Sequence, residues 1–389
     1  MRLALIAPTE IPALRANTLQ VMKMAQALVD LGHQVHLVAP QPKPGSARAS
    51  SWEELAHHYG LRTPFAIEWL PSRPRFRRYD YAWKAVRWAQ LLGADLVYTR
   101  LPQAAWLSVK NGVNTILEVH DLPQGFMGPW LFNRFVTNPC ASRLVVITQA
   151  LADDLSQRYQ ARLAEPFLVI APDGVDLARY QDLPQPPEAR QRLAQRHPEG
   201  ALTLLTAQRF TVGYTGHLYP GRGRELMIEL ASRLPEIAFL VVGGEPREVR
   251  ALQIEVQNRR IFNLIVAGFV PNAELPLYQA ACEVLLMPYQ RKVEASSGGD
   301  ISRYLSPMKL FEYLACERAI ISSDLPVLRE VLNPQNAVLV PAEDTQAWAS
   351  AIQRLQAEPE QRQKLAAKAR SQAQCYTWEQ RAARILAGL

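Results

Sequence analysis

The sequence predicts an α/β protein made of two units, each a parallel β-sheet covered by helices on both faces. Short, fully apolar segments alternate with longer amphipathic segments along nearly the whole chain, as expected for parallel strands joined by helices. A Pro- and Gln-rich stretch at 181–200 interrupts this alternation, which then restarts. The length of 389 residues fits about two or three domains. We therefore expect two units of similar size with a linker at 181–200.

Six apolar segments in each unit are expected as strands. In the first unit they are Leu3–Ala7, Val35–Val38, Leu96–Tyr98, Thr115–Val119, Leu144–Thr148 and Leu168–Ile170. In the second unit they are Val212–Thr215, Ala238–Val242, Leu264–Ala267, Val284–Met287, Ala319–Ser322 and Ala337–Leu339. Residues 17–33 carry apolar side chains at helical spacing, which predicts a helix between the first two strands. Ligands of parallel sheets bind at the carboxyl ends of strands, so the residues just after each strand are the candidates for chemistry.

Composition excludes several classes of protein. With 48% hydrophobic and 20% charged residues, the chain is not disordered, collagenous or a coiled coil, and its size allows a core without disulfides or metal. Its four cysteines form no C-x-x-C pair, which indicates neither a zinc site nor a disulfide framework and suits the cytoplasm. No apolar run is long enough to cross a membrane, and the N-terminus is expected as a buried strand rather than a signal peptide.

The net charge of +7 comes mainly from residues 1–180, where Lys and Arg outnumber Asp and Glu by five, against two in 181–389. This imbalance indicates an anionic partner, either phosphate or a membrane face. Nucleic acid is not expected as a partner, because the basic residues form no long stripe and no recognition module is present.

Two strand ends of the first unit carry candidate residues. Asn17 or Thr18 is expected to cap the helix after the first strand, with the N–H groups of its first turn facing the crevice, although a plain structural cap fits equally. No G-x-G-x-x-G motif is present there, which argues against a nicotinamide-dependent dehydrogenase. His120 directly follows the strand at 115–119. It is either a hydrogen-bond partner for a substrate hydroxyl or leaving phosphate, or a partly buried structural histidine.

In the second unit, the glycine-containing segment 214–224 lies between a strand and a helix. Its glycines let the backbone approach an anion, the helix N-terminus favours negative charge, and Arg222 either binds a phosphate or remains a solvated loop charge. The segment does not fit the Walker A pattern. The next strand ends, Gly268-Phe269-Val270 and Met287-Pro288-Tyr289, form either a slot for a planar base or ordinary loops.

The segment 294–315 carries the most informative pattern. Its first part is a polar, Gly-containing loop suited to ordering over a ligand. Ser306 is expected to cap the following helix, with Pro307 at the first helical position. Lys309 and Glu312 then fall on one face of that helix near its N-terminus. Such a face suits a diphosphate and a sugar diol, and a purely structural capped helix fits the same pattern.

Together these motifs resemble the retaining glycosyltransferases of family 4 over nearly the whole chain. The most specific likeness is SPMKLFEYLA at 306–315 with AIISS at 319–323. Residues 171–176, 214–223 and 241–246 resemble the family's interdomain turn, phosphate loop and next strand end, and 15–28 resembles a branch associated with cell-surface polysaccharides. The resemblance implies the GT-B fold, in which two Rossmann-like doubly wound domains face each other across a cleft. The domains would be 1–180, completed by a C-terminal helix at 377–389, and 181–376.

The resemblance also implies roles for individual residues. Glu312 matches the glutamate that binds the donor ribose, whereas Tyr304 stands where the family has its other glutamate. Asp300 or the backbone of 305–308 would then hold the sugar hydroxyls. Arg222 replaces the phosphate-binding lysine, His217 replaces the arginine before it, Lys309 restores the missing positive charge, and His120 matches the histidine that hydrogen-bonds the donor sugar. The expected catalytic residues are His120, Arg222, Lys309 and Glu312. The expected donor-binding residues are Ala16, Asn17, Gly216, His217, Arg222, Gly268, Phe269, Val270, Met287, Asp300, Tyr304, Leu305, Ser306, Pro307, Met308, Lys309 and Glu312.

The implied reaction is the transfer of a hexose from a nucleotide diphosphate sugar to a sugar or lipid-linked acceptor in polysaccharide biosynthesis, with retention of configuration. We expect the donor to be a UDP-sugar and the hexose to be glucose. The nucleotide sugar is a substrate; no cofactor is expected, and no metal, since no D-x-D motif stands at a strand end. Two alternatives stay open: a nucleotide-sugar epimerase of the same fold, and a catalytically silent nucleotide-sugar-binding subunit, which Tyr304 motivates.

Residues 73–88 interleave aromatic and basic side chains, with Tyr81, Lys84 and Trp88 at helical spacing. Either this stretch lies on an anionic membrane and brings the enzyme to a lipid-linked acceptor, or it packs on the sheet with a solvated basic face. The expected location is the cytoplasm, with contact at the inner face of the membrane in the first case.

Overall fold

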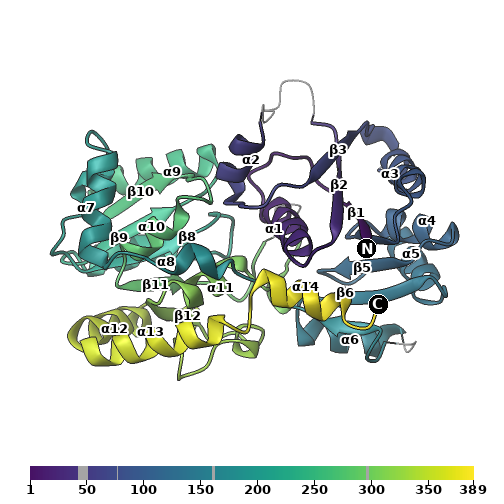
Figure 1. Cartoon of the computed structure of the whole chain (residues 1–389). Helices are drawn as coiled ribbons and strands as arrows, with labels where there is room; N and C mark the ends of the chain where they lie inside the picture. Colours follow the sequence, from purple (N-terminus) through teal and green to yellow (C-terminus); the bar gives the residue numbers. More distant parts are fainter. Residues whose placement is uncertain (43–50, 77, 160–162, 295–297) are drawn as a thin grey trace. The chain divides into compact units, whose positions relative to one another are not determined.

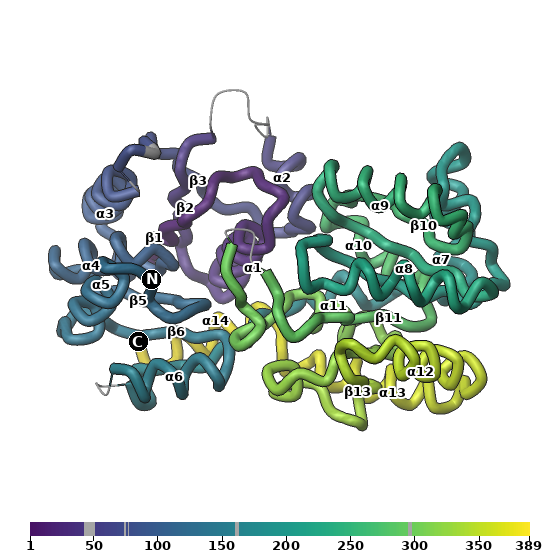
Figure 2. Tube along the Cα trace, turned by 180° about the vertical axis from the view of Figure 1, so that it is seen from behind, coloured from purple at the N-terminus to yellow at the C-terminus, as the bar shows by residue number. Residues whose placement is uncertain are grey.

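The computed structural model describes residues 1–42, 51–76, 78–159, 163–294 and 298–389, which form two compact units (Figures 1 and 2). The first unit is Met1–Asp173 with Trp378–Leu389, and the second is Gly174–Thr377. The chain thus leaves the first unit earlier than the boundary expected at 180. The predicted linker at 181–200 is wrong, because this stretch forms helix α7 (Pro186–Arg196) within the second unit. Its prolines mark the start of that helix, where no backbone N–H donor is needed.

The first unit contains a seven-stranded parallel sheet in the order β3-β2-β1-β4-β5-β6-β7. The strands are β1 (Arg2–Ile6), β2 (Gln34–Pro40), β3 (Ala66–Leu70), β4 (Leu96–Thr99), β5 (Thr115–Val119), β6 (Ala141–Val146) and β7 (Leu168–Ile170). The helices are α1 (Ala16–Asp30), α2 (Trp52–Tyr59), the 3-10 helix η1 (Pro74–Phe76), α3 (Tyr79–Leu92), α4 (Pro102–Lys110), α5 (Met127–Val136), α6 (Gln149–Tyr159) and, from the end of the chain, α14 (Trp378–Leu386). Helices α3, α4 and α5 lie side by side, and α14 packs beside α1 (Figure 1).

The second unit contains a six-stranded parallel sheet in the order β10-β9-β8-β11-β12-β13. The strands are β8 (Thr211–Thr215), β9 (Ala238–Val242), β10 (Leu264–Gly268), β11 (Val284–Met287), β12 (Ala319–Ser323) and β13 (Val338–Val340). Besides α7, the α-helices are α8 (Arg224–Arg233), α9 (Pro246–Asn258), α10 (Leu275–Ala280), α11 (Met308–Ala315), α12 (Thr345–Ala357) and α13 (Pro359–Ala373). The 3-10 helices are η2 (Leu177–Tyr180), η3 (Ala201–Leu204), η4 (Ser302–Tyr304) and η5 (Leu328–Glu330).

The apolar segments form strands because helices cover both faces of each sheet. Strands β8, β9 and β12 are buried along their whole length, so every side chain in them contributes to a core. All twelve predicted strands are present, with their ends shifted by a few residues, which confirms the predicted fold class. The strand that the sequence pattern missed, β3, is an edge strand that stays partly exposed along its length, and it therefore lacks an apolar run.

The strand order sets where ligands can bind. In each sheet the chain runs outward from a central strand to one edge and then crosses to the other side, between β1 and β4 in the first unit and between β8 and β11 in the second. The loops that follow the two central strands diverge at such a switch point and leave room for a ligand. The carboxyl ends of β8 and β11, and of β1 and β4, are therefore the places to look for a site.

The end of the chain completes the first unit through α14. Arg143, which is buried on β6, donates hydrogen bonds to the carbonyl oxygens of Ile385 and Ala387, the latter at 2.9 Å. A cation at this end of a helix satisfies carbonyl groups that have no partner within the helix and complements the helix dipole. The buried residues Ala382 and Ile385 fix the apolar face of α14 in the core.

Candidate functional site

Glycines shape the loop that follows β8. Gly216 has φ +134°, and a Cβ atom there would lie 2.8 Å from Nζ of Lys309. Gly221 has φ +83°, and its Cβ atom would lie 1.9 Å from the carbonyl oxygen of Lys292. Only glycine allows the backbone to adopt these angles and to approach its neighbours this closely. The loop is therefore held tightly against the segment after β11 and against the start of α11.

Lys309, in the first turn of α11, has a buried ammonium group without a hydrogen-bond partner among the described residues. The residue is 8% exposed, and Nζ lies 3.6 Å from the ring centroid of Tyr214 and 5.4 Å from that of Tyr289. Burial lowers the pKa of Lys309 well below its usual range, the charge of Arg222 lowers it further, and Glu312 opposes the shift. Aromatic faces stabilise a buried cation only in part, so this group is suited to bind an anion.

Arg222 supplies a second positive charge at the same loop. Its guanidinium carbon lies 5.5 Å from the ring centroid of Tyr219 and 5.9 Å from that of Tyr289. The Tyr219 ring also stacks on His217, with ring centroids 4.8 Å apart and planes inclined by 5°. Within the described ranges no carboxylate forms an ion pair with this guanidinium, which is therefore suited to bind a phosphate. The structure thus brings together the predicted phosphate-binding residues of the second unit.

Glu312 lies on the next turn of α11 and is 8% exposed. Gln279 donates to its Oε2 at 3.2 Å, and Asn272 donates to its Oε1 at 3.5 Å. Gln279 accepts a hydrogen bond from Tyr180, and Asn272 accepts one from Arg179. These amide donors fix the carboxylate while leaving it further acceptor capacity for a pair of hydroxyls. Local sequence patterns give no signal for this arrangement, because the amides lie 33 and 40 residues away along the chain.

The start of α11 differs from the prediction. Pro307 has an extended backbone and occupies the N-cap position, so Ser306 is not the cap and the helix begins at Met308. A proline ring fixes φ but leaves ψ free, and here ψ of 128° ends the preceding extended segment rather than starting the helix. Ser306, Pro307 and Met308 remain partly exposed, whereas Tyr304 and Leu305 are buried.

The expected slot for a base is only partly present. Met287 is fully buried in the core rather than at the surface of a slot, and its expected contact with the donor stays a prediction. Phe269 is 43% exposed just after β10, where Gly268 takes φ +75°, and Val270 is partly buried against the core. A flat, accessible ring at this strand end is suited to stack on a base.

Asp300 holds its own loop. Its Oδ1 accepts hydrogen bonds from the backbone N–H groups of Ser302, at 2.9 Å, and Val293, at 3.1 Å. These two bonds lower the pKa of Asp300. The side chain is therefore occupied in part by a structural task, and its expected contact with sugar hydroxyls stays a prediction.

In the first unit, Glu118 near the end of β5 is a buried carboxylate with four side-chain partners. Its Oε1 accepts from Gln20 at 2.7 Å and from His120 at 2.5 Å and lies 3.0 Å from Nη2 of Arg381, and the Tyr98 hydroxyl donates to Oε2. Burial favours the protonated carboxyl, but Arg381 and His120 outweigh it and hold the pKa of Glu118 well below its usual range. In the sequence, the single charged residue within the mainly apolar strand TILEV is the signal that could have identified Glu118.

His120 is a neutral, partly exposed side chain fixed by Glu118. Burial, followed by the charge of Arg100, lowers the pKa of His120 to about 4 against the opposing effect of Glu118. The imidazole is therefore uncharged at neutral pH and acts through hydrogen bonds. Asp173 closes the same cluster, and burial raises its pKa to about 6 although the charge of Arg381 opposes the rise.

The predicted helix cap in the first unit is wrong. Helix α1 begins at Ala16, and Arg15 occupies its N-cap position. The Arg15 side chain makes no capping hydrogen bond. Asn17 is already the second residue of the helix. The Thr18 hydroxyl lies 2.9 Å from the hydroxyl of Thr9, so it is used inside the unit rather than at the helix end.

The predicted surface stripe of α3 turns out to face the core in part. Tyr81 is fully buried, with its hydroxyl 2.8 Å from two backbone carbonyl oxygens, and Trp88 packs against the core. Trp83 is 53% exposed, and the guanidinium of Arg87 lies 5.5 Å from its ring centroid. Arg77 lies outside the described residues. No helix in the described ranges combines the length and the apolar character needed to span a bilayer.

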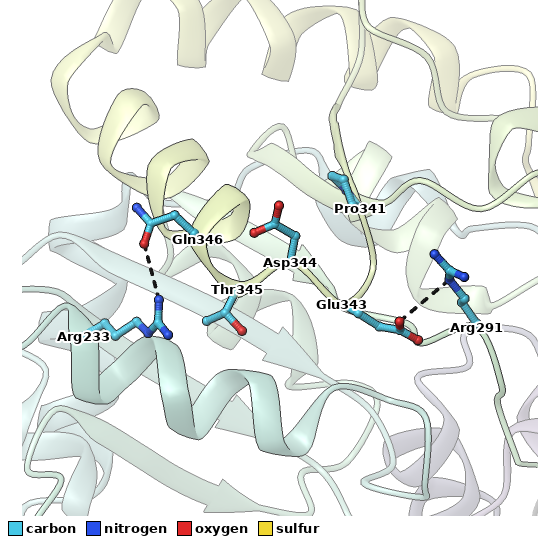
Figure 3. Close-up of a pocket in the computed structure, with 7 residues that line it drawn as sticks. All are labelled: Arg233, Arg291, Pro341, Glu343, Asp344, Thr345 and Gln346. Atoms are coloured by element: carbon cyan, nitrogen blue, oxygen red, sulfur yellow. Dashed lines mark hydrogen bonds and ion pairs between the residues drawn. The ribbon is translucent and has the colours of Figure 1, made fainter.

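A pocket of about 540 Å³ follows β13 at the edge of the second sheet (Figure 3). It is lined by Arg233, Arg291, Pro341, Glu343, Asp344, Thr345 and Gln346. Its charged groups largely satisfy one another, since Arg291 pairs with Glu343 at 3.8 Å and Asp344 caps α12. None of the predicted site residues lines it. In the described part of the chain, no three His, Cys, Asp or Glu side chains are grouped so that they could hold a metal ion.

Comparisons with known proteins match both units of the chain to glycosyltransferases. Residues 209–358 match the family described as Glycosyl transferases group 1, and residues 19–179 match Glycosyltransferase Family 4, so the two matches together cover most of the chain. A phosphatidyl-myo-inositol mannosyltransferase of Mycolicibacterium smegmatis is 23% identical over 99% of this chain and 92% of its own length. A D-inositol 3-phosphate glycosyltransferase of Xylanimonas cellulosilytica is 29% identical over 62% of this chain, and the match spans 55% of that relative.

Solved structures share the fold. Anabaena Alr3699/HepE in complex with UDP superposes with a TM-score of 0.72 at 17% identity, over 100% of both chains. Sucrose-phosphate synthase from Thermosynechococcus elongatus superposes with a TM-score of 0.71 at 18% identity, over 98% of this chain and 96% of that chain.

Proposed function

This chain belongs to the family-4 glycosyltransferases, and we propose that it transfers glucose from UDP-glucose to a sugar or lipid-linked acceptor with retention of the anomeric configuration. The observation that carries the proposal is the buried ammonium of Lys309, packed on aromatic rings beside the glycine loop after β8. The choice of donor is supported by the UDP and UDP-glucose complexes of Anabaena Alr3699/HepE. Because one relative is a mannosyltransferase, a nucleotide diphosphate mannose is the alternative donor to test.

The diphosphate would bind at Lys309 and Arg222. These two cationic groups balance the two negative charges on the diphosphate of a nucleotide sugar, and the backbone at Gly216 can approach a phosphate oxygen closely. Negative charge grows on the diphosphate as the bond to the sugar breaks. Groups already in place around that charge lower the barrier without reorganisation. Lys309 and Arg222 would therefore act in catalysis as well as in binding.

The ribose and the sugar would be held by different groups. Glu312, fixed by its two amide donors, can accept hydrogen bonds from both ribose hydroxyls. Tyr304 offers no carboxylate for the transferred sugar, so its hydroxyls would rely on the backbone of 305–308 and on His120. A neutral imidazole suits this task, because it accepts a hydrogen bond at one nitrogen while donating at the other.

Nucleotide binding tests the proposal directly. A thermal-shift and calorimetric series with UDP, UDP-glucose, GDP and GDP-mannose should show stabilisation by the uridine ligands, which amounts to about 2.7 kcal/mol at a hundredfold excess over Kd. Lys309→Met should strongly reduce this response, whereas Lys364→Met, which changes an exposed lysine on α13, should leave it intact. Stabilisation by GDP-mannose alone would identify GDP-mannose as the donor in place of UDP-glucose. The absence of a response to every nucleotide would contradict the proposal.

Catalysis is separated from silent binding by product formation. We expect slow hydrolysis of the donor in the absence of an acceptor and faster release of UDP with one, and both should be abolished by Glu312→Ala and His120→Ala. Inositol phosphates and lipid-linked sugars are the acceptor classes to compare, given the names of the relatives. Binding without turnover would favour the silent subunit, and interconversion of UDP-sugars would favour the epimerase.

We also propose that the reaction needs no divalent cation, because Lys309 and Arg222 supply the positive charge at the leaving diphosphate. Turnover should then be unchanged by EDTA. A large loss with EDTA that manganese restores would contradict this part of the proposal.

The helices α3, α4 and α5 are proposed to contact an anionic membrane. Exposed or half-buried tryptophans on these neighbouring helices are paired with cations: Arg87 with Trp83, Lys110 with Trp106 and Arg134 with Trp130, at 5.5, 5.2 and 5.6 Å. Phe126, just before α5, is 93% exposed. Aromatic and basic side chains together fit the interface of an anionic bilayer.

Liposome co-sedimentation tests this contact. Replacing both Arg87 and Arg134 with glutamine should weaken binding to vesicles with 30% anionic lipid, by about 1 kcal/mol per charge. The matched control replaces two exposed arginines of the second unit, Arg192 and Arg354. Equal binding by both double variants would contradict the membrane assignment.

A further inference from the structure

The C-terminal helix reaches the predicted sugar-binding histidine through a buried line of polar groups. Arg381 on α14 is 5% exposed, and its Nη2 lies 3.0 Å from Oε1 of Glu118. The same oxygen lies 2.5 Å from Nε2 of His120. Residues from the last helix, from β5 and from the segment after β5 are thus connected in the order Arg381, Glu118, His120.

We propose that Arg381 is a positioning residue: it keeps Glu118 ionised, and the ionised carboxylate fixes His120 in one tautomer, with its proton on Nε2 and with Nδ1 left to accept a hydrogen bond from a sugar hydroxyl. The inference rests on the proposed function, in which His120 binds the donor sugar. The proposal gives Arg381, near the end of the chain, a role in the reaction, although Arg381 is not among the candidate catalytic residues.

Arg381 is itself firmly held. Its Nε donates to the carbonyl oxygen of Pro172 at 3.0 Å, and its Nη1 donates to the Tyr98 hydroxyl at 3.3 Å and lies 3.2 Å from Sδ of Met24. These partners belong to three elements: the segment after β7, β4 and α1. A planar guanidinium with donors in fixed directions can meet them all at once, which a lysine ammonium cannot. The position of the charge beside Glu118 is therefore set by the surrounding fold.

The surroundings of Glu118 also decide where the histidine proton lies. Its Oε1 accepts hydrogen bonds from Gln20 and His120, and the guanidinium of Arg381 lies close to the same oxygen. An ionised carboxylate can only accept, so Nε2 of His120 must carry the proton in this contact. A neutral imidazole then has its lone pair on Nδ1. Hydrogen bonding at one ring nitrogen selects the tautomer and orientation of the whole ring.

Removing Arg381 should change the protonation of His120 in one direction. The groups that face the histidine and its carboxylate are Glu118 on β5, Tyr98 on β4, Arg100 after β4, Asp173 after β7 and Arg381 on α14. Loss of Arg381 removes a positive charge that disfavours the imidazolium, and it leaves Glu118 without its main countercharge. Both changes draw a proton towards the pair formed by His120 and Glu118, so His120 should titrate at a higher pH.

Long-range ¹H–¹⁵N spectra of protein labelled with ¹⁵N-histidine report tautomer and protonation without any substrate. In the wild type we expect the Nε2–H tautomer for His120, with no titration above pH 5; His120→Gln identifies its signals. Arg381→Gln should raise the pKa of His120 by about one unit or more or mix its tautomers. Arg381→Lys, which keeps the charge, should restore part of the wild-type spectrum, and Glu118→Gln should allow the other tautomer. Arg384→Gln, an exposed change on the same helix, should alter neither.

A kinetic experiment then links the tautomer to the reaction. In Arg381→Gln the acid limb of kcat/KM should move to higher pH, and KM for UDP-glucose should rise about tenfold, as expected for one hydrogen bond, while the affinity for UDP stays unchanged. An unaltered His120 tautomer and titration in folded Arg381→Gln, or in Glu118→Gln if the first variant does not fold, would overturn the inference. Wild-type inactivity towards every nucleotide sugar would instead overturn the proposed function, and the spectra would still decide the role of Arg381.

Discussion

Replacing Gly216 with alanine is expected to weaken nucleotide binding without unfolding the second unit. The new Cβ atom would lie 2.8 Å from Nζ and 3.0 Å from Cε of Lys309, so the lysine must move away from the ring of Tyr214. The residue would also be strained at φ +134°, which lowers stability by about 1–3 kcal/mol. Losing one charge-assisted contact to a phosphate costs about 1.5–3 kcal/mol, so Kd for UDP should rise about 10–100-fold.

Titration calorimetry with UDP at pH 7 separates the clash from the strain. Gly112 has φ +74°, and a Cβ atom there would meet no atom within 4 Å, so Gly112→Ala adds strain without a clash. It should bind UDP like the wild type. A double variant with Gly216→Ala and Lys309→Met should bind no more weakly than Lys309→Met, because both changes remove the same contact. A Gly216→Ala protein that binds UDP within about twofold of the wild type would show that Lys309 does not hold the diphosphate.

Three further predictions concern protons and the base. A bound diphosphate should raise the depressed pKa of Lys309, so UDP binding should take up protons above neutral pH; calorimetry in buffers of different ionisation enthalpy measures this uptake, and Lys309→Met should abolish it. The pKa of His120, about 4, lies below the value of about 6.5 in an unfolded chain, so its contribution of about 3 kcal/mol to stability is complete above pH 6.5 and is lost as the pH falls towards 4. Denaturant unfolding at pH 5 and 7 should therefore depend less on pH in His120→Gln, and an equal dependence would count against the assigned pKa. Phe269→Ala should weaken UDP binding about tenfold by removing a stacking ring, whereas Phe262→Ala, at an 80% exposed position, should not; equal effects would remove Phe269 from the base site.

The alternation of apolar strands and amphipathic helices was sufficient to predict the fold class. Each buried strand is a short apolar run, whereas the partly exposed edge strand β3 does not follow this pattern. The Pro-rich stretch at 181–200 misled because proline is as typical of a helix start as of a linker. In the same way, serine is a residue type that often caps helices, which is why Ser306 was predicted as the cap. The backbone of Pro307 is extended, so the helix starts one residue later than predicted.

The candidate site was predictable where its residues are neighbours in one element. Lys309 and Glu312 lie three residues apart on one helix, so their common face follows from helical geometry. Contacts made by tertiary packing were not predictable in this way. Arg381 donates a hydrogen bond to Tyr98, which lies 283 residues earlier in the chain. No local pattern on α14 distinguishes Arg381 from Arg384, which is exposed.

Retaining transfer from UDP-glucose can be followed by NMR with a donor that is labelled with ¹³C at C1 of the glucose. We expect the wild-type protein to release UDP and to form a product whose C1 keeps the α configuration, and we expect Lys309→Met to form none. Formation of a β-configured product, or the absence of turnover with UDP-glucose across the acceptor classes named above, would contradict this proposal.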